Sequence, residues 1–376
     1  MGQLVDGQWR TENILVNHDD KGLYFKRPSI FRSTIGSEAQ SEFPAEPDRY
    51  HLYCAVACPW AHRATLMRTL KKLEPLVTLA NTFQEPGGQG WSFGEAGHSV
   101  PGTNRRVRWL HELYTIADRA CTTRVTVPTL WDATTRRVVN NESSEIIRIF
   151  NTAFSGIAEP TPDYYPQALR PEIDATNAVV LKGVNSAVNG CGYSISQEAY
   201  DSSVKELFET LDGLEQRLSG QRYLCGEVET EADWRLFPSL VRFDPCYYVG
   251  YKCNLRRLDE YRNLSNYLRD LYQTPGIAAV CDIAGMKRGV FGKAGPVGSN
   301  GIIPAGPRST MRGRTIATAS RGVIERSAIV ATVGWASRYE SQAAWTKSLR
   351  RGAPAVAQAR GFLSALRSLN CFVTAQ

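Results

Sequence analysis

The stretch Tyr50-His51-Leu52-Tyr53-Cys54-Ala55-Val56-Ala57-Cys58-Pro59-Trp60-Ala61-His62-Arg63 decides the expected fold of this chain. Its apolar and aromatic first part predicts a strand over 50–54. Pro59 is favoured in the first turn of a helix, where its missing N–H costs nothing. The apolar pattern then continues and predicts a helix over 59–73. We therefore expect Cys58 at the junction between a strand and the N-terminus of a helix.

Cys58 carries the clearest chemical signature in the sequence. At a helix N-terminus, the macrodipole and the free backbone N–H groups favour an anion. A thiol in that place is expected to have a lowered pKa and to act as a thiolate nucleophile. A dithiol redox motif would have a second cysteine three residues on, where this chain has Ala61. The sequence thus predicts a monothiol site that needs an outside thiol, such as glutathione. The alternatives are an inert buried Cys58, or resolution by Cys54.

Length, cysteine count and charge exclude several classes of protein. The chain has 376 residues, 43% of them hydrophobic, which is enough for two domains. Its nine cysteines are too few for a disulfide scaffold and show no paired ligand spacing, so no metal site is expected.

The positive charge of the chain lies in its last segment. The net charge is +7, but residues 308–376 carry a balance of +9, which leaves −2 (+7 − 9) for residues 1–307. Because the basic segment has no recognition motif, we expect no nucleic-acid partner.

The N-terminal run gives no targeting signal. Met1-Gly2-Gln3-Leu4-Val5-Asp6-Gly7 has no signal-peptide core and an incomplete myristoylation motif. No apolar run in the chain is long enough to span a membrane. We expect a cytoplasmic protein with no membrane partner.

The order of the predicted elements defines an α/β domain. After the strand and helix around Cys58 we expect, in turn, a strand over 76–80, a long loop over 84–93, a helix over 106–118, a β-rich stretch over 124–132, a strand over 137–139 and a helix through Ile146 and Ile149. Pro128 interrupts the β-rich stretch and belongs at an edge, a strand start or a cis turn. This order is that of a thioredoxin-like domain, placed at 49–155 after an irregular lead-in over 1–48.

The second half of the chain predicts an all-helical domain over 164–290. Apolar residues recur there at spacings of three and four along a stripe made of Val204, Leu207, Phe208, Leu211, Leu214 and Leu218. Thr230 and Asp233 resemble a capping box, and a further helix fits 263–272. After residue 307 the composition shifts to Arg, Ala, Ser, Thr and Gly, so 308–376 are predicted to be a basic, poorly ordered tail.

Several motifs in these two domains resemble one known family. In chain order they are Cys58-Pro59-Trp60-Ala61-His62-Arg63, Gly90-Trp91-Ser92-Phe93, Arg124-Val125-Thr126-Val127-Pro128, Asn140-Asn141-Glu142-Ser143-Ser144-Glu145-Ile146-Ile147, Arg242-Phe243-Asp244-Pro245, Lys252-Cys253-Asn254-Leu255-Arg256-Arg257 and Asn263-Leu264-Ser265-Asn266-Tyr267-Leu268-Arg269-Asp270. Together they resemble the glutathionyl-hydroquinone reductases, or Xi-class glutathione transferases, over about residues 1–307. Residues 291–307 then form a family-like C-terminal segment. The resemblance implies the glutathione transferase architecture, an α/β thioredoxin-like domain followed by an all-α domain, and a homodimer.

The resemblance also implies which residues bind and attack glutathione. Cys58 would be the nucleophile. Pro128 would be the cis-proline that leaves the backbone of Val127 free to pair with the cysteinyl part of glutathione. Trp91 and Arg124 would close over the glycine end and the cysteinyl region.

The γ-glutamyl end of glutathione would lie at a second helix N-terminus. Glu142 would hold its ammonium group, and Ser143 would bind its carboxylate by hydroxyl and backbone N–H. Each of these residues also has a purely structural interpretation. Ser143 could be only an N-cap, Glu142 only a first-turn acid, and Trp91 only a loop anchor.

The half of the site that would bind the acceptor departs from the family. The run Gly190-Cys191-Gly192-Tyr193-Ser194-Ile195-Ser196 is about three residues shorter than its family counterpart, and Tyr193 is the candidate for the acceptor-site tyrosine. A second acceptor-site tyrosine falls where this chain has Gly289-Val290-Phe291. Phe291 cannot donate the hydrogen bond that a tyrosine gives to a leaving phenolate. We expect an intact glutathione half and an altered hydroquinone half.

The implied activity is the glutathione-dependent reduction of glutathionyl-hydroquinones to hydroquinones. Cys58 would attack the sulfur of the conjugate, and a second glutathione would resolve the mixed disulfide. The expected partners are glutathione and glutathionyl-aromatic small molecules. The altered acceptor residues leave a thioltransferase or dehydroascorbate reductase as an alternative. A non-catalytic binding module with the same fold is the third hypothesis, although such modules typically lose the nucleophile.

Overall fold

The computed structural model describes residues 2–11, 18–25, 27–38, 40–297, 300–307 and Met311. Residues Met1–Ala319 form one compact unit, and every element below belongs to it. Except for Met311, the predicted tail over 308–376 lies outside the described residues. In the described part of the chain, no helix is long and apolar enough to cross a membrane.

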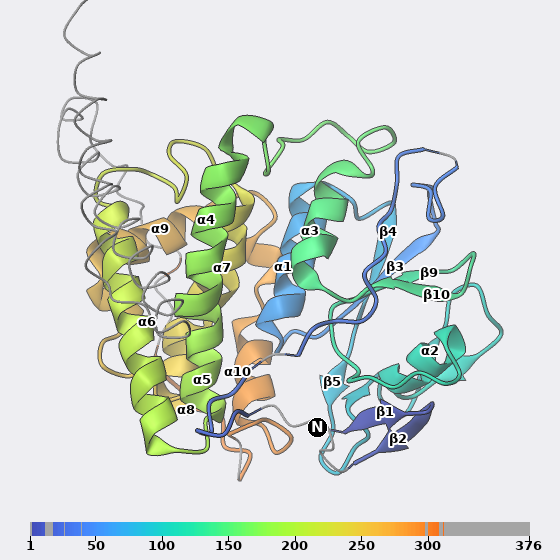
Figure 1. Ribbon diagram of the computed structural model, residues 1–376, viewed down its shortest axis with the longest axis horizontal. Coiled ribbons are helices and arrows are strands. Elements are labelled where there is room, and N and C mark those ends of the chain that lie inside the picture. The colour runs from blue at the N-terminus through green and yellow to red at the C-terminus, as the bar shows by residue number, and fades with distance from the viewer. Residues whose placement is uncertain are drawn as a thin grey trace, which may run out of the picture. The chain divides into compact units, whose positions relative to one another are not determined.

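A four-stranded mixed sheet organises the first half of the chain (Figure 1). Its strands are β3 (Tyr50–Cys54), β4 (Val77–Asn81), β9 (Thr129–Asp132) and β10 (Arg137–Asn140), in the spatial order β10-β9-β3-β4. β3 pairs parallel with β4 and antiparallel with β9, and β9 pairs antiparallel with β10. One parallel crossover followed by an antiparallel hairpin is the order predicted for a thioredoxin-like domain.

Two helices pack together between the sheet and the helical half of the chain. They are α1 (Pro59–Leu70) and α3 (Ser143–Thr152), and α1 also contacts α7 (Glu231–Arg242). Helix α2 (Leu110–Ala117) lies apart from them, beyond β9 and β10 (Figure 1). α1 ends three residues before the predicted position, because Lys72 takes a left-handed conformation at φ +53°.

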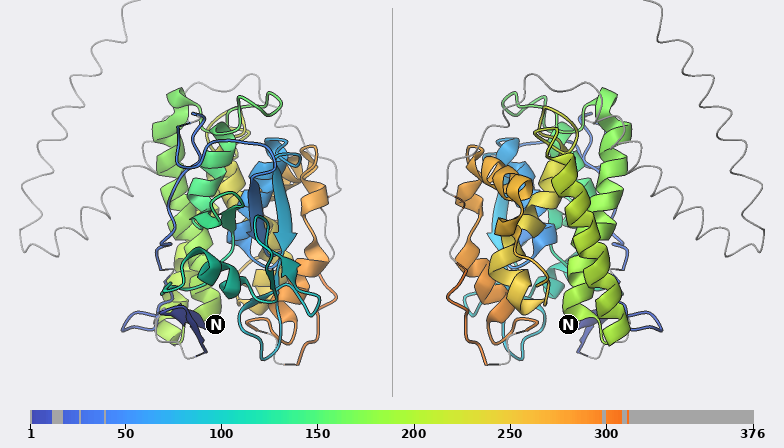
Figure 2. Two further views of the ribbon diagram at one scale, coloured as in Figure 1. Left: turned by 90° about the vertical axis from the view of Figure 1, so that its right-hand side faces the viewer. Right: turned by 90° about the vertical axis from the view of Figure 1, so that its left-hand side faces the viewer.

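The second half of the described chain is helical, as predicted. Its α-helices are α4 (Arg170–Val180), α5 (Ala187–Tyr193), α6 (Gln197–Arg217), α7, α8 (Tyr248–Gly250), α9 (Arg262–Gln273) and α10 (Ile283–Phe291). π-helical turns over Leu181–Ser186 and Phe243–Tyr247 join α4 to α5 and α7 to α8. The capping box of Thr230 and Asp233 is present at the start of α7. Figure 2 shows the molecule from two sides. The sheet and α2 face the viewer on the left, and the helices of the second half face the viewer on the right. The boundaries 49–155 and 164–290 stay predictions.

The prediction of an irregular lead-in is wrong for residues 3–10. These residues form a hairpin of β1 (Gln3–Val5) and β2 (Gln8–Arg10), joined by Asp6 and Gly7 at positive φ. Asp-Gly is a strong signal for a two-residue hairpin turn. The buried Leu4 donates from its N–H to the carbonyl of Thr123 at 2.9 Å, so the hairpin is attached to the α/β domain.

Three further predictions differ from the structure in the segment before β9. The expected loop over 84–93 contains a short pairing of β5 (Phe83–Gln84) with β6 (Trp91–Ser92). The helix expected from 106 begins at Leu110, because 106–107 form β8 and pair with β7 (His98–Ser99). The stretch 124–128 precedes the sheet, and β9 begins only after the cis peptide bond between Val127 and Pro128.

A buried ion pair connects the two central strands of the sheet. Arg49, which directly precedes β3, donates from Nε and Nη2 to the two carboxylate oxygens of Asp132, the last residue of β9, at 2.8 and 2.7 Å. Asp132 is 0% exposed and Arg49 is 7% exposed. Bidentate pairs of this kind combine charge with fixed geometry.

Candidate active site

Cys58 caps the N-terminus of α1, where the sequence places it. Its φ and ψ of −84° and 116° are extended, and its sulfur accepts a hydrogen bond from the N–H of Ala61 at 3.5 Å. The same sulfur lies 3.6 Å from the carbonyl oxygen of Val127. The predicted junction of strand and helix is confirmed. An anion at this sulfur faces the positive end of a helix, which favours the thiolate.

The other described cysteines differ from Cys58 in their burial. Burial raises the pKa to about 12 for Cys54 and Cys281, and to about 11 for Cys121, Cys225 and Cys246. All eight cysteines in the described ranges are free, and Cys58 alone among them is half-buried rather than buried. The Cys54 thiol donates to the carbonyl of Ala61 at 3.6 Å. A buried, protonated Cys54 is a poor candidate to resolve a disulfide at Cys58.

Arg63 places a positive charge on the same helix. It is 4% exposed, donates to Asn185 Oδ1 at 2.5 Å, and its guanidinium carbon lies 4.5 Å from the ring centroid of Trp60. Burial lowers its pKa to about 9, which still leaves it protonated at neutral pH. A buried cation one turn and a half from Cys58 adds to the potential that favours a thiolate. Sequence inspection missed this role, since Arg63 looks like an ordinary helix residue.

A buried phenol joins the loop that carries Val127 to the start of α3. The Tyr114 hydroxyl on α2 donates to the carbonyl of Thr126 at 3.0 Å and lies 2.9 Å from Thr129 Oγ1. Asn141, just before α3, donates from Nδ2 to the same hydroxyl at 3.2 Å. These bonds fix the backbone of 126–129 against the residues that precede α3.

Helix α3 begins with a capping glutamate and a buried serine. Glu142 is the N-cap, so the interpretation of Ser143 as an N-cap is wrong. Ser143 is 1% exposed, and its hydroxyl has no hydrogen-bond partner among the described residues. A buried hydroxyl at a helix N-terminus can donate to a bound anion beside the backbone N–H groups of the first turn. Glu142 accepts from the Ser29 hydroxyl at 3.0 Å and from the Ser144 N–H at 3.4 Å.

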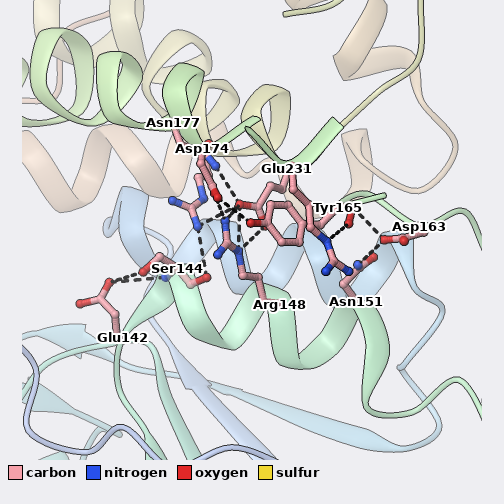
Figure 3. Close-up of polar contacts among 11 residues, drawn as sticks. Glu142, Ser144, Arg148, Asn151, Asp163, Tyr165, Asp174, Asn177 and Glu231 are labelled. Carbon is pink, nitrogen blue, oxygen red and sulfur yellow. Dashed lines mark hydrogen bonds and ion pairs between the residues drawn. The ribbon is translucent and has the colours of Figure 1, made fainter. Parts of the chain in front are cut away.

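The helical half of the chain holds α3 in place through a polar network (Figure 3). Arg148 on α3 bonds Glu231 on α7 at 2.7 Å, and its guanidinium carbon lies 3.8 Å from the ring centroid of Tyr165. Asn177 on α4 also donates to Glu231, at 2.8 Å. Arg235 on α7 donates to the carbonyl of Ser144 at 3.3 Å. The start of α3 thus depends on contacts from α4 and α7.

The structure places Trp91 and Arg124 on separate segments. Trp91 lies on β6 and is 8% exposed. Arg124 is half-buried, and burial lowers its pKa. The phenol of Tyr24, in the lead-in, raises the pKa of Arg124, and the nearby charge of Arg27 lowers it. The lead-in also pairs through Leu4 with Thr123, the residue before Arg124, so it passes the same edge of the domain as the loop before Pro128, which sequence inspection missed.

A cluster of tyrosines, Tyr24, Tyr193, Tyr247 and Tyr251, gathers beside α5 and α8. The Tyr193 ring centroid lies 5.2 Å from those of Tyr24 and Tyr251, and the Tyr247 and Tyr251 centroids are 5.0 Å apart. Burial, with a smaller contribution from the charge of Cys58, raises the pKa of Tyr193 and Tyr247. Tyr247 lines one hollow with Pro59 and Trp60, the two residues that follow Cys58. Of its members only Tyr193 was predicted. The run from Tyr247 to Tyr251, after the Arg242-Phe243-Asp244-Pro245 motif, is the signal that could have found two more.

Arg242 connects the helical half to the loop that carries Cys58. This 1% exposed residue at the end of α7 donates to the carbonyls of Val56 and Pro238 at 2.8 and 3.0 Å, and lies 2.9 Å from His62 Nδ1. Because arginine only donates, His62 Nδ1 accepts and its proton is on Nε2. Burial, assisted by Arg242, keeps the pKa of His62 well below its usual value.

Replacing Arg242 with methionine should lower the free energy of unfolding by about 1–3 kcal/mol, since it leaves the Val56 carbonyl and the buried His62 Nδ1 without a donor. Urea unfolding of the variant beside the wild type measures this. The exposed Arg262→Met on α9 is the control and should change the unfolding free energy by less than about 0.5 kcal/mol. Equal effects of the two substitutions would show that the contacts of Arg242 do not stabilise the loop.

Comparison with known proteins assigns the family. The family models described as glutathione S-transferase, N-terminal domain, and glutathione S-transferase, C-terminal domain, match residues 57–153 and 197–270. Glutathionyl-hydroquinone reductase PcpF of Sphingobium chlorophenolicum is 41% identical over 316 residues, 84% of this chain and 99% of the relative. Glutathionyl-hydroquinone reductase YqjG of Escherichia coli is 42% identical over 314 residues, 82% of this chain and 95% of the relative.

Solved structures agree with this assignment. The glutathione-bound structure of YqjG matches with a TM-score of 0.72 at 40% identity, covering 82% of this chain and 97% of that one. The Xi-class glutathione transferase of Natrialba magadii matches with a TM-score of 0.75 at 36% identity, covering 84% and 95%. The fold is thus that of a glutathione transferase. Within that class, the chain belongs to the Xi-class family of glutathionyl-hydroquinone reductases, which confirms the resemblance predicted from its motifs.

Proposed function

We propose that this protein reduces glutathionyl-hydroquinones to hydroquinones, with glutathione as co-substrate and Cys58 as the nucleophile. One observation carries the proposal. The Cys58 sulfur lies at the N-terminus of α1, 3.6 Å from the carbonyl oxygen of Val127. The chain that carries it is 41% identical to a glutathionyl-hydroquinone reductase, over 99% of that relative's length. No three His, Cys, Asp or Glu side chains of the described ranges gather to hold a metal ion.

The proposed binding mode uses both helix N-termini. The backbone of Val127, next to the cis-proline Pro128, would pair with the cysteinyl part of glutathione as an added strand does. The N-terminus of α3, with the buried hydroxyl of Ser143, would take the γ-glutamyl carboxylate. Glu142 would pair with the ammonium group beside it.

Trp91 and Arg124 would bind the remaining part of glutathione. Arg124 supplies a cation for the glycine carboxylate or the cysteinyl carbonyl, and Trp91 supplies an apolar wall. Both assignments follow the family motifs quoted above, and Trp91 is at the same time anchored in the β5–β6 pairing.

The reaction has two displacement steps. The Cys58 thiolate attacks the sulfur of the conjugate, a sulfur–sulfur bond forms, and the carbon–sulfur bond breaks with its electron pair left on the ring. A proton completes the hydroquinone. A second glutathione then attacks the mixed disulfide and releases glutathione disulfide, restoring Cys58. The ring carbon is reduced and two glutathione sulfurs are oxidised.

A thioltransferase or dehydroascorbate reductase activity is the second candidate. Phe291, at the end of α10, is 6% exposed and offers no hydroxyl to an aromatic acceptor. Steady-state turnover of a glutathionyl-hydroquinone, compared with that of a mixed disulfide of glutathione, separates the two. Turnover of the disulfide alone would replace the proposed function with this one, and no turnover of either would favour a binding module.

The proposal also places the protein in the cytoplasm as a homodimer. A catalytic thiol that cycles through glutathione needs a reducing, glutathione-rich compartment. The dimer follows from the family resemblance, and sedimentation of the full chain at equilibrium would test it.

Replacing Ser143 with alanine should raise the KM for glutathione at least about tenfold, because a hydrogen bond to a charged group contributes about 1.5–3 kcal/mol. The fold should be unaffected, as the lost hydroxyl has no partner among the described residues. Steady-state kinetics over a range of glutathione concentrations give the KM. Thr152→Ala, at the other end of α3, is the control and should leave it unchanged. An unchanged KM in Ser143→Ala would remove the hydroxyl from the binding site.

A further inference from the structure

Two tyrosine hydroxyls form a pair in the cluster beside α5 and α8. Tyr193 Oη, at the end of α5, lies 2.6 Å from Tyr251 Oη, just after α8. Their ring planes are inclined at 63° and their centroids are 5.2 Å apart. Gly192 makes the approach possible, since a Cβ atom at this position would lie 2.5 Å from Cδ2 of Tyr251. The absence of a side chain at Gly192 thus lets the second phenol reach Tyr193.

The surroundings of the pair decide which hydroxyl donates. Tyr251 is 5% exposed, and Tyr193 is the hydrogen-bond partner of its hydroxyl among the described residues. Buried hydroxyl protons are nearly always donated, so Tyr251 donates to Tyr193. Tyr193 is half-buried and its own proton stays available for a ligand. Burial raises the pKa of Tyr193 to about 12, so it is protonated at neutral pH.

Contacts through α10 connect the pair to the nucleophile. Gly289 on α10 packs closely against Ala57, the residue before Cys58. A Cβ atom added at Gly289 would lie only 2.2 Å from the Cβ of Ala57. Two residues on, Phe291 lies against Gly250, where an added Cβ would be 3.1 Å from its ring. Gly250 directly precedes Tyr251. The end of α10 is therefore packed between the Cys58 loop and the pair, and it presents a phenyl ring without a hydroxyl.

We propose that Tyr251 is a positioning residue. Its hydroxyl donates to Tyr193 and directs the Tyr193 proton toward the aromatic leaving group, so that Tyr193 acts as the general acid in carbon–sulfur cleavage. This inference rests on the proposed function and names the proton donor that the function leaves open.

The proton balance closes within one catalytic cycle. As Cys58 takes the glutathionyl sulfur, the electron pair of the broken carbon–sulfur bond takes the proton of Tyr193. Tyr193 is left as a phenolate that accepts the hydrogen bond of Tyr251. The thiol of the second glutathione must lose a proton to attack the mixed disulfide, and it returns that proton to Tyr193. General acids of this kind contribute typically 10²–10⁴-fold in rate.

The test compares two leaving groups in single turnover. The full-length wild type, Tyr193→Phe and Tyr251→Phe are each mixed with a glutathionyl-hydroquinone, or with a mixed disulfide of glutathione and 2-mercaptoethanol. Glutathionylation of Cys58 is followed by mass spectrometry, and thermal unfolding is recorded for each protein. A thiolate leaves the disulfide without a proton, whereas the ring carbon requires one. The control Tyr200→Phe also loses a hydroxyl bond, at 2.8 Å to the carbonyl of Lys252.

We expect the reaction with the hydroquinone conjugate to slow about 100-fold in Tyr193→Phe and about tenfold in Tyr251→Phe. The reaction with the disulfide should change less than twofold in both, and Tyr200→Phe should change neither. Equal slowing of both reactions in Tyr251→Phe would mean a purely structural role and would overturn the inference, as would no slowing. A wild type that reacts with the disulfide but not with the conjugate would overturn the proposed function and this inference with it.

Discussion

Cys58→Ser is expected to lower kcat/KM for a glutathionyl-hydroquinone at least about a thousandfold, which corresponds to about 4 kcal/mol of lost transition-state stabilisation. The hydroxyl of serine stays protonated at neutral pH and cannot replace a thiolate that attacks sulfur. The other described cysteines offer no substitute, because burial leaves those such as Cys54 protonated. Steady-state assays with substrate and glutathione in excess measure the loss.

The same variant should still bind glutathione, since Val127, Glu142 and Ser143 are unchanged. Calorimetric titration of Cys58→Ser with glutathione should give an affinity within about threefold of the wild type. The matched control is Cys54→Ala, four residues earlier on β3, which should retain its turnover per folded molecule. If Cys58→Ser kept more than a tenth of the wild-type activity, the covalent mechanism would be wrong.

Asp132→Asn is expected to lower the free energy of unfolding by about 3–5 kcal/mol at pH 7, the usual cost of breaking a buried ion pair on one side. The substitution keeps the shape of the side chain but leaves the 7% exposed guanidinium of Arg49 without its bidentate partner. Glu46 still bonds Arg49, at 3.0 Å, but from an exposed position. Urea unfolding gives the difference, provided that the slope against urea stays constant.

The stabilisation from Asp132 should depend on pH with a definite sign. Burial alone would raise the pKa of this carboxyl, but hydrogen bonds from Arg49, Thr135 and Thr134 outweigh it and hold the pKa below its usual value. Such a group stabilises the fold fully above its unfolded pKa, about 3.9, and loses this contribution as the pH falls through the lowered folded value. The stability difference between wild type and Asp132→Asn should therefore be constant from pH 7 to about 5 and shrink below about 4.

An exposed pair on α6 provides the control for this experiment. Lys205 and Glu209 are 3.9 Å apart with side chains 74% and 68% exposed, so Glu209→Gln should cost no more than about 0.5 kcal/mol. If Asp132→Asn and Glu209→Gln had the same free energy of unfolding, the ion pair that joins β3 and β9 would not contribute to the stability of the sheet.

Local signals in the sequence were enough for the thiol half of the site. The apolar run before Cys54, Cys58 before Pro59, and Thr230 with Asp233 each act over a few residues, and each appears in the structure as predicted. The order of elements then gave the sheet, since a thioredoxin-like domain has few ways to place them. The Asp6-Gly7 turn was equally local and was overlooked.

Contacts between distant residues could not be predicted in this way. Tyr193 and Tyr251 are 58 positions apart, and Arg242 and His62 are 180 apart. Pattern and propensity say nothing about such pairs, because packing of the helices decides which side chains meet. The same holds for Ser143, whose buried hydroxyl without a partner becomes visible only when its surroundings are known.

The most direct test of the central claim is a single turnover of the wild-type protein with a glutathionyl-hydroquinone and no added glutathione. Mass spectrometry of the protein and analysis of the released aromatic would be done on the same sample. Attack by Cys58 predicts one glutathione bound at Cys58 for each hydroquinone released, and release of the protein thiol when glutathione is then added. Hydroquinone released without glutathione on Cys58, or glutathione on another cysteine, would contradict the assignment of Cys58 as the nucleophile.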